Sequence, residues 1–339
     1  MAPQRIVVVM PNWFGETLFT TPFLRALRSA LPNTFIAALG VQRVHEVLHG
    51  NPCVNELVMF EPAMMGLPLV HRLRQLRFDA AIILRRSLTR SVLLCLAGIP
   101  KRIGFANPKS GWLLTHSVRA PEARIHKAHT YLSLLASLDV SVDGAQHSYE
   151  YYSTIDERQQ AETLLRNRGV MRQRPIIVLH PGANWSHKCW PMARFAQLAD
   201  RLGRDGTVVM TGGPDDRLLV QGIAAHMTHS PVILAGETSL RQLAACLERA
   251  DIVVSNDTGV LHIASALRRF VVALYGPTSP AFTGPLGDPA KMVVIHHADC
   301  CPSIPCFAPH HPGYPGMDAI TVDEVYDAVR SLLSQSPSS

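Results

Sequence analysis

Four polar or small residues that could hold a phosphate follow an apolar run in the C-terminal half of the chain. The run Val253–Asn256 leads into Asp257, Thr258 and Gly259, and His262 comes one helical turn later. The apolar spacing after Gly259 predicts a helix, whose first backbone N–H groups are unpaired and carry partial positive charge. Because such a helix start binds phosphate, we expect these residues to contact a phosphorylated ligand. A structural role in the core is the alternative for His262.

A second segment, His180–Pro191, also follows a predicted buried strand. Gly182 leaves room for a ligand, and a fixed Lys188 would stabilise the negative charge that builds on a departing diphosphate, without a metal. The alternative is a lysine exposed to solvent. In a third segment, Asp215 or Asp216 could hold ribose hydroxyls, although a turn explains either carboxylate as well.

A carboxylate near the start of the chain is a candidate general base. Glu16 follows the first predicted strand and lies in the first turn of the helix that comes next. A negative charge is favoured in the first turn of a helix, so Glu16 could simply stabilise the helix start. It could equally act as the general base that removes a proton from a hydroxyl nucleophile. The segment lacks the Gly-x-Gly-x-x-Gly pattern, which disfavours a nicotinamide site.

The net charge of +6 belongs to the N-terminal part, since residues 1–150 hold 16 Lys and Arg against 9 Asp and Glu. Such a field attracts an anionic partner. Nucleic acid is disfavoured, because no basic motif is interleaved with aromatic residues. A solvated basic face is the alternative to a binding surface. The cations that we expect to form a compact binding group are Arg85, Arg86, Arg90, Lys101 and Arg102.

Cys300, Cys301 and Cys306, followed by His310 and His311, could ligate zinc by their chemistry. Their spacing is not that of a standard zinc knuckle, and the prolines around them favour a rigid extended loop. We therefore expect no metal.

Alternating strands and helices along the 339 residues position these segments. The alternation runs to Leu138 and restarts at Ile176, which predicts an α/β protein with two doubly wound Rossmann-like domains, residues 1–170 and 175–320. Ligands of such sheets bind at the carboxyl ends of the strands, so the polar segments of the two domains would face each other across a cleft. No apolar run is long enough to span a bilayer and no signal peptide is indicated, so we expect a cytoplasmic protein.

Together these segments resemble glycosyltransferase family 9, the ADP-heptose:lipopolysaccharide heptosyltransferases. The most specific matches are Gly236–Leu240 and Ser255–His262. The segment after Cys301 looks most like the heptosyltransferase II branch. Further matches are Gly15-Glu16 with Thr20–Pro22, Leu96–Phe105, His126-x4-Tyr131, His180–Ala183 with Lys188–Pro191, and Tyr275–Pro280.

The resemblance implies a GT-B fold, with a helix at 321–334 that crosses back to the N-terminal domain, and an inverting transfer without a metal or other cofactor. The donor would be ADP-heptose and the acceptor the anionic heptosyl-Kdo2-lipid A inner core of lipopolysaccharide. The enzyme would touch the inner membrane peripherally, and no protein partner is implied. By position, Glu16 takes the place of the catalytic base and Lys188 that of the phosphate-binding lysine. The donor-binding positions are Gly182, Asp215, Asp257, Thr258, Gly259 and His262, and the five cations named above would bind the acceptor.

The chain departs from the family pattern at two of these places. Glu16 replaces an Asp, which keeps the chemistry and lengthens the reach, and Arg85-Arg86 replaces the usual Pro-Asn before Ser87. The alternatives are a family 9 transferase with another nucleotide-sugar donor or acceptor, a nucleotide-sugar epimerase-type enzyme of the same architecture, and a non-catalytic sugar-nucleotide binder.

Overall fold

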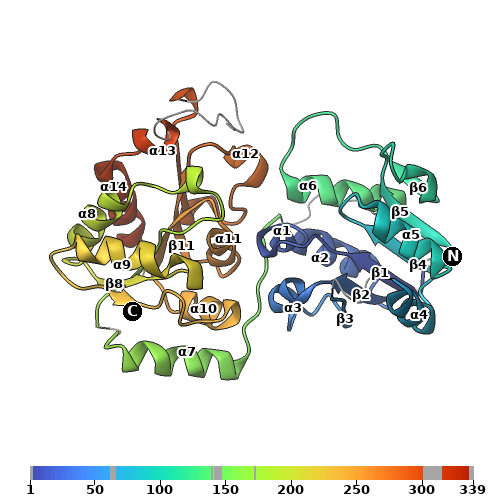
Figure 1. The fold of residues 1–339 in the computed structure, drawn as a ribbon, viewed down its shortest axis with the longest axis horizontal. Coiled ribbons are helices and arrows are strands. Elements are labelled where there is room, and N and C mark those ends of the chain that lie inside the picture. Colours follow the sequence, from blue (N-terminus) through green and yellow to red (C-terminus); the bar gives the residue numbers. More distant parts are fainter. Residues whose placement is uncertain are drawn as a thin grey trace. The chain divides into compact units, whose positions relative to one another are not determined.

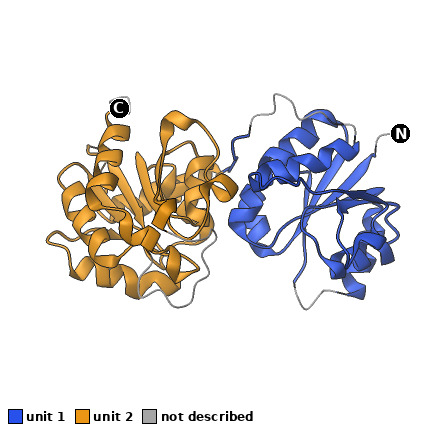
Figure 2. Cartoon of the chain, turned by 90° about the horizontal axis from the view of Figure 1, so that it is seen from above, with its two compact units in different colours: residues 1–152 blue, residues 153–339 orange. Residues whose placement is uncertain are grey.

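The computed structural model describes residues 3–61, 66–138, 140, 147–171, 173–300 and 315–335. They form two compact units that divide between Tyr152 and Ser153 (Figure 2). Each unit contains one six-stranded sheet whose paired strands run parallel. In the part of the chain that the structure describes, no helix is both long and apolar enough to cross a membrane.

Unit 1 orders its strands β3-β2-β1-β4-β5-β6 (Figure 1). The strands are β1 (Arg5–Val9), β2 (Phe35–Gly40), β3 (Glu56–Met59), β4 (Ala80–Ile83), β5 (Lys101–Phe105) and β6 (His116–Val118). The helices are α1 (Phe14–Leu18), α2 (Thr21–Ala30), α3 (Gln42–Leu48), α4 (Leu67–Leu76), α5 (Leu88–Leu96) and α6 (Lys127–Leu132), with short 3-10 helices η2 (Gly111–Leu113) and η3 (Ser133–Leu138). Residues Ile6–Val9 are fully buried, because a central parallel strand is covered on both faces.

Unit 2 orders its strands β12-β11-β10-β7-β8-β9. The strands are β7 (Ile176–His180), β8 (Thr207–Met210), β9 (Val232–Ile233), β10 (Ile252–Asn256), β11 (Phe270–Tyr275) and β12 (Met292–His296). The α-helices are α7 (Ile155–Asn167), α8 (Met192–Leu202), α9 (Arg217–Ala225), α10 (Leu240–Leu247), α11 (Gly259–Ala266), α12 (Pro280–Thr283), α13 (Pro315–Ala319) and α14 (Val322–Leu333). The 3-10 helices are η4 (Ser186–Lys188), η5 (Pro214–Asp216), η6 (Pro289–Lys291) and η7 (Ala298–Cys300).

The boundary between the units differs from the predicted one. The sequence assigns α7 to a domain 1–170, but α7 packs on α10 of unit 2. Glu157 on α7 accepts hydrogen bonds from the guanidinium of Arg241 on α10 at 2.5 and 2.6 Å. These bonds lower the pKa of Glu157 to about 2. The ion pair between Glu157 and Arg241 joins α7 to unit 2. The boundary therefore lies before α7, and the predicted boundary at 170–175 is wrong.

The last helix, α14, also packs within unit 2. Its apolar face contributes Val325, Val329 and Leu332 to the core of that unit, against α8, β10 and β11. Thr321 and Glu324 form a capping box at its start, which fixes where the helix begins. The apolar face of α14 is thus used inside unit 2, and the crossing of this segment to the N-terminal domain stays a prediction.

Each sheet has one place where the strand order reverses. In unit 1 the reversal lies between β1 and β4, and in unit 2 between β7 and β10. Ligands of open α/β sheets bind outside the carboxyl ends of the strands at such a point. The residues that follow these four strands are therefore where a site is expected in each unit.

Candidate functional site

Asp257 is the centre of a polar cluster at the carboxyl end of the unit 2 sheet. Its Oδ2 accepts hydrogen bonds from Lys188 Nζ at 2.6 Å and from Thr278 Oγ1 at 2.6 Å. Asp257 follows β10, Lys188 ends η4 after β7, and Thr278 follows β11. Three neighbouring strand ends thus meet at one carboxylate, and the structure brings two of the predicted site residues, Lys188 and Asp257, into direct contact.

The cluster is largely removed from water, since the side chains of Lys188 and Asp257 are 18% and 5% exposed. Burial alone would raise the pKa of Asp257. The charges of Lys188 and His262, and the hydrogen bonds from Lys188 and Thr278, outweigh burial, so this pKa lies below its usual value. Asp257 is therefore an anion at neutral pH that fixes Lys188 Nζ beside the start of α11.

The start of α11 keeps its backbone donors available. Thr258 is the N-cap residue, yet its side chain makes no capping hydrogen bond, and its Oγ1 lies 3.1 Å from Ser255 Oγ instead. Gly259 begins the helix, and His262 is buried one turn later, with Nε2 3.8 Å from Asp257 Oδ1. The first turn of α11, with the partial positive charge of its N–H groups, thus begins two residues after Asp257, the residue that holds Lys188 Nζ.

Asn256 fastens the segment that carries Lys188 to β10. Its Nδ2 donates to the carbonyl oxygen of Pro181 at 2.7 Å, and its Oδ1 accepts the N–H of Trp190 at 3.2 Å. The segment between Pro181 and Trp190 is thereby tied at both ends, which limits the positions open to Lys188.

The predicted ribose-binding carboxylates differ in their surroundings. Asp215 is exposed, whereas Asp216 Oδ2 accepts the N–H of Gly213 at 2.8 Å. A Cβ on Gly182 would lie 2.4 Å from Cγ of Asp216. Gly182 thus makes room for a neighbouring side chain, which is a different reason for a glycine from the predicted room for a ligand. Burial lowers the pKa of His180 to about 4, although the charge of Asp216 opposes this.

Glu16 lies on α1, directly after the carboxyl end of β1. Its Oε1 accepts a hydrogen bond from Lys127 Nζ at 2.7 Å, and its side chain is 24% exposed. Lys127 begins α6, which His126 caps through Nδ1. Burial, reinforced by the charge of Glu16, raises the pKa of Tyr131 on the same helix. The predicted base is therefore a carboxylate oriented by a cation, with part of its surface open to solvent.

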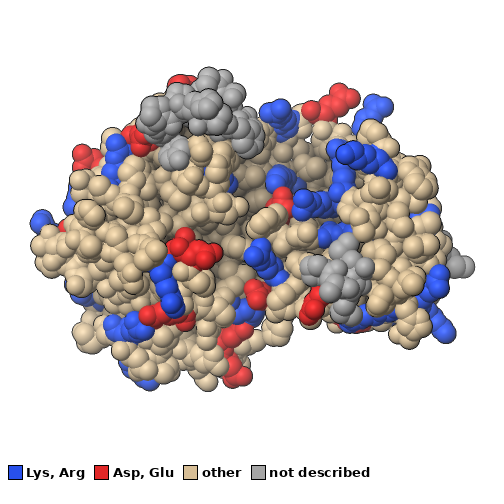
Figure 3. All heavy atoms as spheres, viewed as in Figure 1, with Lys and Arg blue, Asp and Glu red and all other residues tan. Residues whose placement is uncertain are grey.

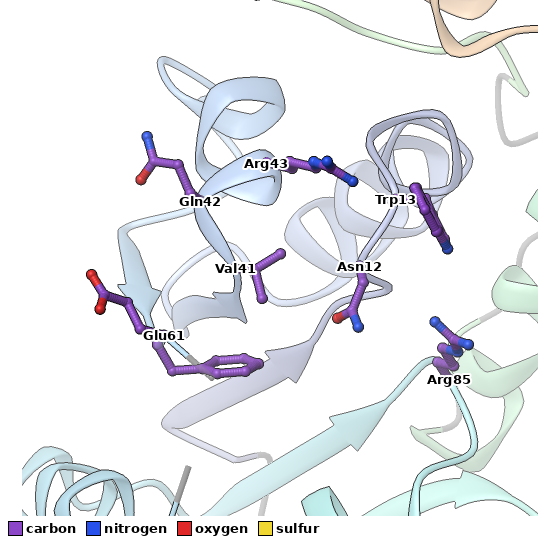
Figure 4. Close-up of a pocket in the computed structure, with 8 residues that line it drawn as sticks. Asn12, Trp13, Val41, Gln42, Arg43, Glu61 and Arg85 are labelled. Atoms are coloured by element: carbon purple, nitrogen blue, oxygen red, sulfur yellow. The ribbon is translucent and has the colours of Figure 1, made fainter. Parts of the chain in front are cut away.

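A pocket of about 560 Å³ lies in unit 1 at the same end of the sheet. Cζ of Arg43 lies 5.3 Å from the centre of the Trp13 ring, within range of a cation–π contact. Figure 4 shows Arg43 extending toward Trp13, with Gln42 and Glu61 on the other side of the pocket. The residues that line the pocket are Asn12, Trp13, Val41, Gln42, Arg43, Phe60, Glu61 and Arg85.

Arg90 lies behind this pocket and is only 8% exposed. Its guanidinium donates to the carbonyl oxygen of Met10 at 2.6 Å and also to Asn12 Oδ1, with Cζ 5.6 Å from the centre of the Phe60 ring. Burial and the charge of Arg85 lower its pKa to about 10. Arg90 therefore reaches the pocket through Asn12 and not, as predicted, by facing a partner directly.

The other predicted cations separate into two groups. Lys101 and Arg102 begin β5 and lie level with the first residues of β4, whereas Arg85 and Arg86 follow its end. The prediction of one compact group is therefore wrong, because a strand runs between its two halves. Arg85 and Arg86 are exposed at the end of the sheet that carries the pocket.

Of the possible zinc ligands, Cys300 is exposed at the end of η7. Cys301, Cys306, His310 and His311 lie outside the described residues. Within the described ranges, no three His, Cys, Asp or Glu side chains are grouped so as to hold a metal ion.

Sequence reasoning missed three contributors. Thr278 lies in the matched segment Tyr275–Pro280 and directly after a strand, which is a signal that could have found it. Lys127 lies inside the matched His126-x4-Tyr131 segment, but nothing in that pattern points to Glu16. Arg43 belongs to no motif and joins Trp13 only because β1 and β2 are neighbours.

The model of glycosyltransferase family 9 (heptosyltransferase) matches residues 67–308 of this chain. The chain belongs to this family. Lipopolysaccharide heptosyltransferase 2 of Escherichia coli K12 is 30% identical over 306 residues, which cover 86% of this chain and 88% of that protein. Lipooligosaccharide heptosyltransferase 2 of Haemophilus influenzae is 29% identical over 306 residues, with the same coverage.

Solved structures agree with the sequence relatives. The structure of E. coli ADP-heptose lps heptosyltransferase II matches with a TM-score of 0.82 at 29% identity, covering 98% of this chain and 99% of that one. This family 9 member is thus a glycosyltransferase with the GT-B fold, as the resemblance implies. Neither the family nor these relatives favour an epimerase-type enzyme.

Proposed function

We propose that this family 9 enzyme transfers L-glycero-D-manno-heptose from ADP-heptose to the heptosyl-Kdo2-lipid A inner core of lipopolysaccharide, with inversion at the anomeric carbon. Relatives named lipopolysaccharide heptosyltransferase 2 and ADP-heptose lps heptosyltransferase II support this choice of substrates. The observation that carries it is the contact of Lys188 with Asp257 beside the start of α11. A fixed cation next to a helix start is what a departing diphosphate requires.

On the donor side, Lys188 and the first N–H groups of α11 would bind the diphosphate of ADP-heptose. Asp257 would keep Lys188 Nζ in place, and Thr278 would orient Asp257. Because these groups are fixed before the reaction, they can stabilise the charge that develops on ADP without reorganisation. We therefore propose transfer without a metal or other cofactor. Thr258, Gly259, His262, Gly182 and Asp215 remain predicted donor contacts.

On the acceptor side, Glu16 would take the proton from the attacking hydroxyl. The hydroxyl oxygen then bonds to the anomeric carbon while the bond from that carbon to the β-phosphate oxygen breaks. The electron pair of the broken bond leaves with ADP, and the proton ends on Glu16. Lys127, which holds Oε1 of Glu16 at 2.7 Å, would orient the carboxylate for this step.

The pocket of unit 1 would hold the inner core. Kdo carries a carboxylate, so Arg43, Arg85 and the adjacent Arg86 offer complementary charge, and the face of Trp13 suits a sugar ring. Because the acceptor is anchored in lipid, we propose that the enzyme works at the cytoplasmic face of the inner membrane by peripheral contact. Neither nucleic acid nor a protein partner is required for this reaction.

The experiment offers the purified chain ADP-heptose, UDP-sugars and GDP-sugars, each with and without deacylated inner core, and follows nucleotide release. Release that requires both ADP-heptose and the inner core, with a product heavier by one heptose, is expected. Release with another nucleotide sugar or acceptor would replace the substrates proposed here. An altered free sugar formed without any acceptor would indicate an epimerase-type reaction.

A further inference from the structure

The basic charge of unit 1 is concentrated in one stretch of sequence. Residues 66–124 contain 11 Lys and Arg against 2 Asp and Glu. In the view of Figure 3, Lys and Arg predominate over unit 1, whereas unit 2 shows both signs. The proposed acceptor pocket uses few of these cations, so the remainder need another explanation.

Several of them gather at the edge of the sheet where the strands begin. The guanidinium of Arg74, near the end of α4, donates to the carbonyl oxygen of Leu96 at the end of α5 at 2.7 Å. Arg102, on β5, donates to the carbonyl oxygen of Ile99 at 2.5 Å and to that of Leu113 at 2.8 Å. These bonds link the ends of α4 and α5 to β5 and η2. We term the residues there the basal patch: Arg74, Arg77, Leu96, Lys101, Arg102 and Trp112.

The basal patch combines positive charge with exposed apolar side chains. The side chain of Trp112 on η2 is 75% exposed and that of Leu96 is 50% exposed, although large apolar side chains are usually buried. Arg74 and Arg77 are exposed as well. Among the described residues, none of the four cations makes an ion pair with a carboxylate. Asp79, at the same edge, accepts the N–H groups of Gln4 and Arg5 instead.

We propose that the basal patch docks this enzyme on an anionic lipid surface. Tryptophan is enriched at the boundary between lipid and water, where an apolar ring carries a polar N–H. Lys and Arg near a bilayer are attracted by anionic headgroups. A protein surface or a nucleic acid fits less well, because the cations surround isolated apolar side chains and not a continuous apolar face or a row of aromatic residues. The choice of lipid as the occupant rests on the proposed lipid-anchored acceptor.

This placement also separates docking from chemistry. The basal patch lies where the strands begin, and the pocket and Glu16 lie where they end. Strands of five residues hold these two edges about 16 Å apart. The reacting sugar of the proposed acceptor is itself separated from lipid A by Kdo. An enzyme held by the basal patch would therefore work at a distance from the bilayer that the sugar chain can span.

The test measures co-sedimentation of the full chain with vesicles of phosphatidylethanolamine and phosphatidylglycerol, and with vesicles of phosphatidylcholine. The wild type is expected to bind the first and not the second.

Arg74→Glu with Arg77→Asn changes the charge by three, and since each charge contributes about a fivefold change in affinity, binding should weaken about a hundredfold. Trp112→Ser should weaken binding severalfold, even at high salt. Asn suits the left-handed backbone of Arg77, whose φ is 50°.

Matched controls come from unit 2. Leu218 is 82% exposed and Arg166 is an exposed arginine on α7, so Leu218→Ser with Arg166→Glu changes exposed residues of the same kinds outside the patch. This control should bind vesicles as the wild type does. Thermal unfolding of Trp112→Ser and of the control should match the wild type, because the changed side chains are exposed. Arg74→Glu loses the hydrogen bonds to Leu96, so its vesicle binding is measured at a temperature at which circular dichroism shows the variant to be folded.

Vesicle binding that the patch variants retain, or a wild type that ignores anionic vesicles, would overturn the proposal. Patch-dependent capture of single-stranded RNA in preference to vesicles would replace lipid by nucleic acid. Transfer to deacylated inner core should be unchanged in the patch variants, whereas transfer to acceptor embedded in vesicles should fall. If the proposed substrates are wrong but vesicle binding still depends on the patch, only the proposed function fails.

Discussion

The two sheets share one topology but differ at the carboxyl ends of their strands. In unit 2 the polar side chains there bond to one another, with Lys188 and Thr278 both on Asp257. In unit 1, Arg43 and Arg85 stand around a pocket of about 560 Å³. Side chains that are fixed in advance suit a small ligand group of constant shape, such as a diphosphate. A bulky acceptor instead requires a pocket with enough volume to admit it. Four substitutions test this contrast.

The largest effect is expected at Glu16. Glu16→Gln keeps the shape of the side chain but removes the proton acceptor, so kcat should fall by about 10²–10⁴-fold while the Kd for ADP stays unchanged. Steady-state kinetics and calorimetry separate the two quantities. Glu16→Asp retains a carboxylate and serves as the control. Normal turnover of the Gln variant would show that Glu16, and with it unit 1, does not supply the general base.

Asp257→Asn should break the prearranged site of unit 2. Removing one partner of this pair is expected to cost about 2 kcal/mol of unfolding free energy, less than the roughly 3–5 kcal/mol of a fully buried pair, because Lys188 keeps some contact with solvent. Denaturant unfolding measures this loss. The Kd for ADP should also rise, because Lys188 Nζ is no longer fixed.

The same variant predicts a pH dependence. The pKa of Asp257 is lowered in the folded state from an ordinary value of 3.8. The carboxylate therefore stabilises the fold above about pH 4, and this contribution is lost as the pH falls through the folded-state pKa. The stability difference between the wild type and Asp257→Asn should shrink on acidification.

Arg90→Met tests whether the hydrogen bonds of Arg90 to Met10 and Asn12 hold the buried side of the pocket in place. The variant loses hydrogen bonds to Met10 and Asn12 from a charged donor, so about 1.5–3 kcal/mol of unfolding free energy should be lost. The KM for the acceptor should rise with the Kd for ADP unchanged, and Arg90→Lys should restore part of both losses. Arg86→Met, at an exposed neighbour, should leave stability as it is. A rise in the Kd for ADP would contradict a role confined to unit 1.

The smallest effect is expected at Arg85. Its side chain is exposed, so Arg85→Ala should raise the KM for the acceptor by about 2–5-fold, and salt should raise the wild-type KM in the same way. Acceptor titrations at two ionic strengths provide the measurement. A large change in kcat would mean that this cation acts on the reacting atoms, and the contrast between the two units would need revision.

Sequence patterns predicted the architecture because parallel strands are read from continuous apolar runs such as Ile6–Val9. The short edge strand β6 was missed, since its polar residues give no such run. Lys188 and Asp257 were expected in one site because each lies in a polar segment after a predicted strand, and ligands of such sheets bind at the carboxyl ends of the strands. The pair of Glu16 with Lys127 and the burial of Arg90 depend on side chains more than 70 residues apart, which local spacing does not encode.

The position of α7 has a consequence for building hybrid enzymes. Glu157 on α7 is hydrogen-bonded to Arg241, so α7 belongs structurally to unit 2, which is proposed to bind the nucleotide. A chimera that exchanges acceptor halves between family members should therefore be joined between Tyr152 and Ser153. A junction placed after residue 170 would give the hybrid a helix from the wrong parent, and Arg241 a foreign counterion.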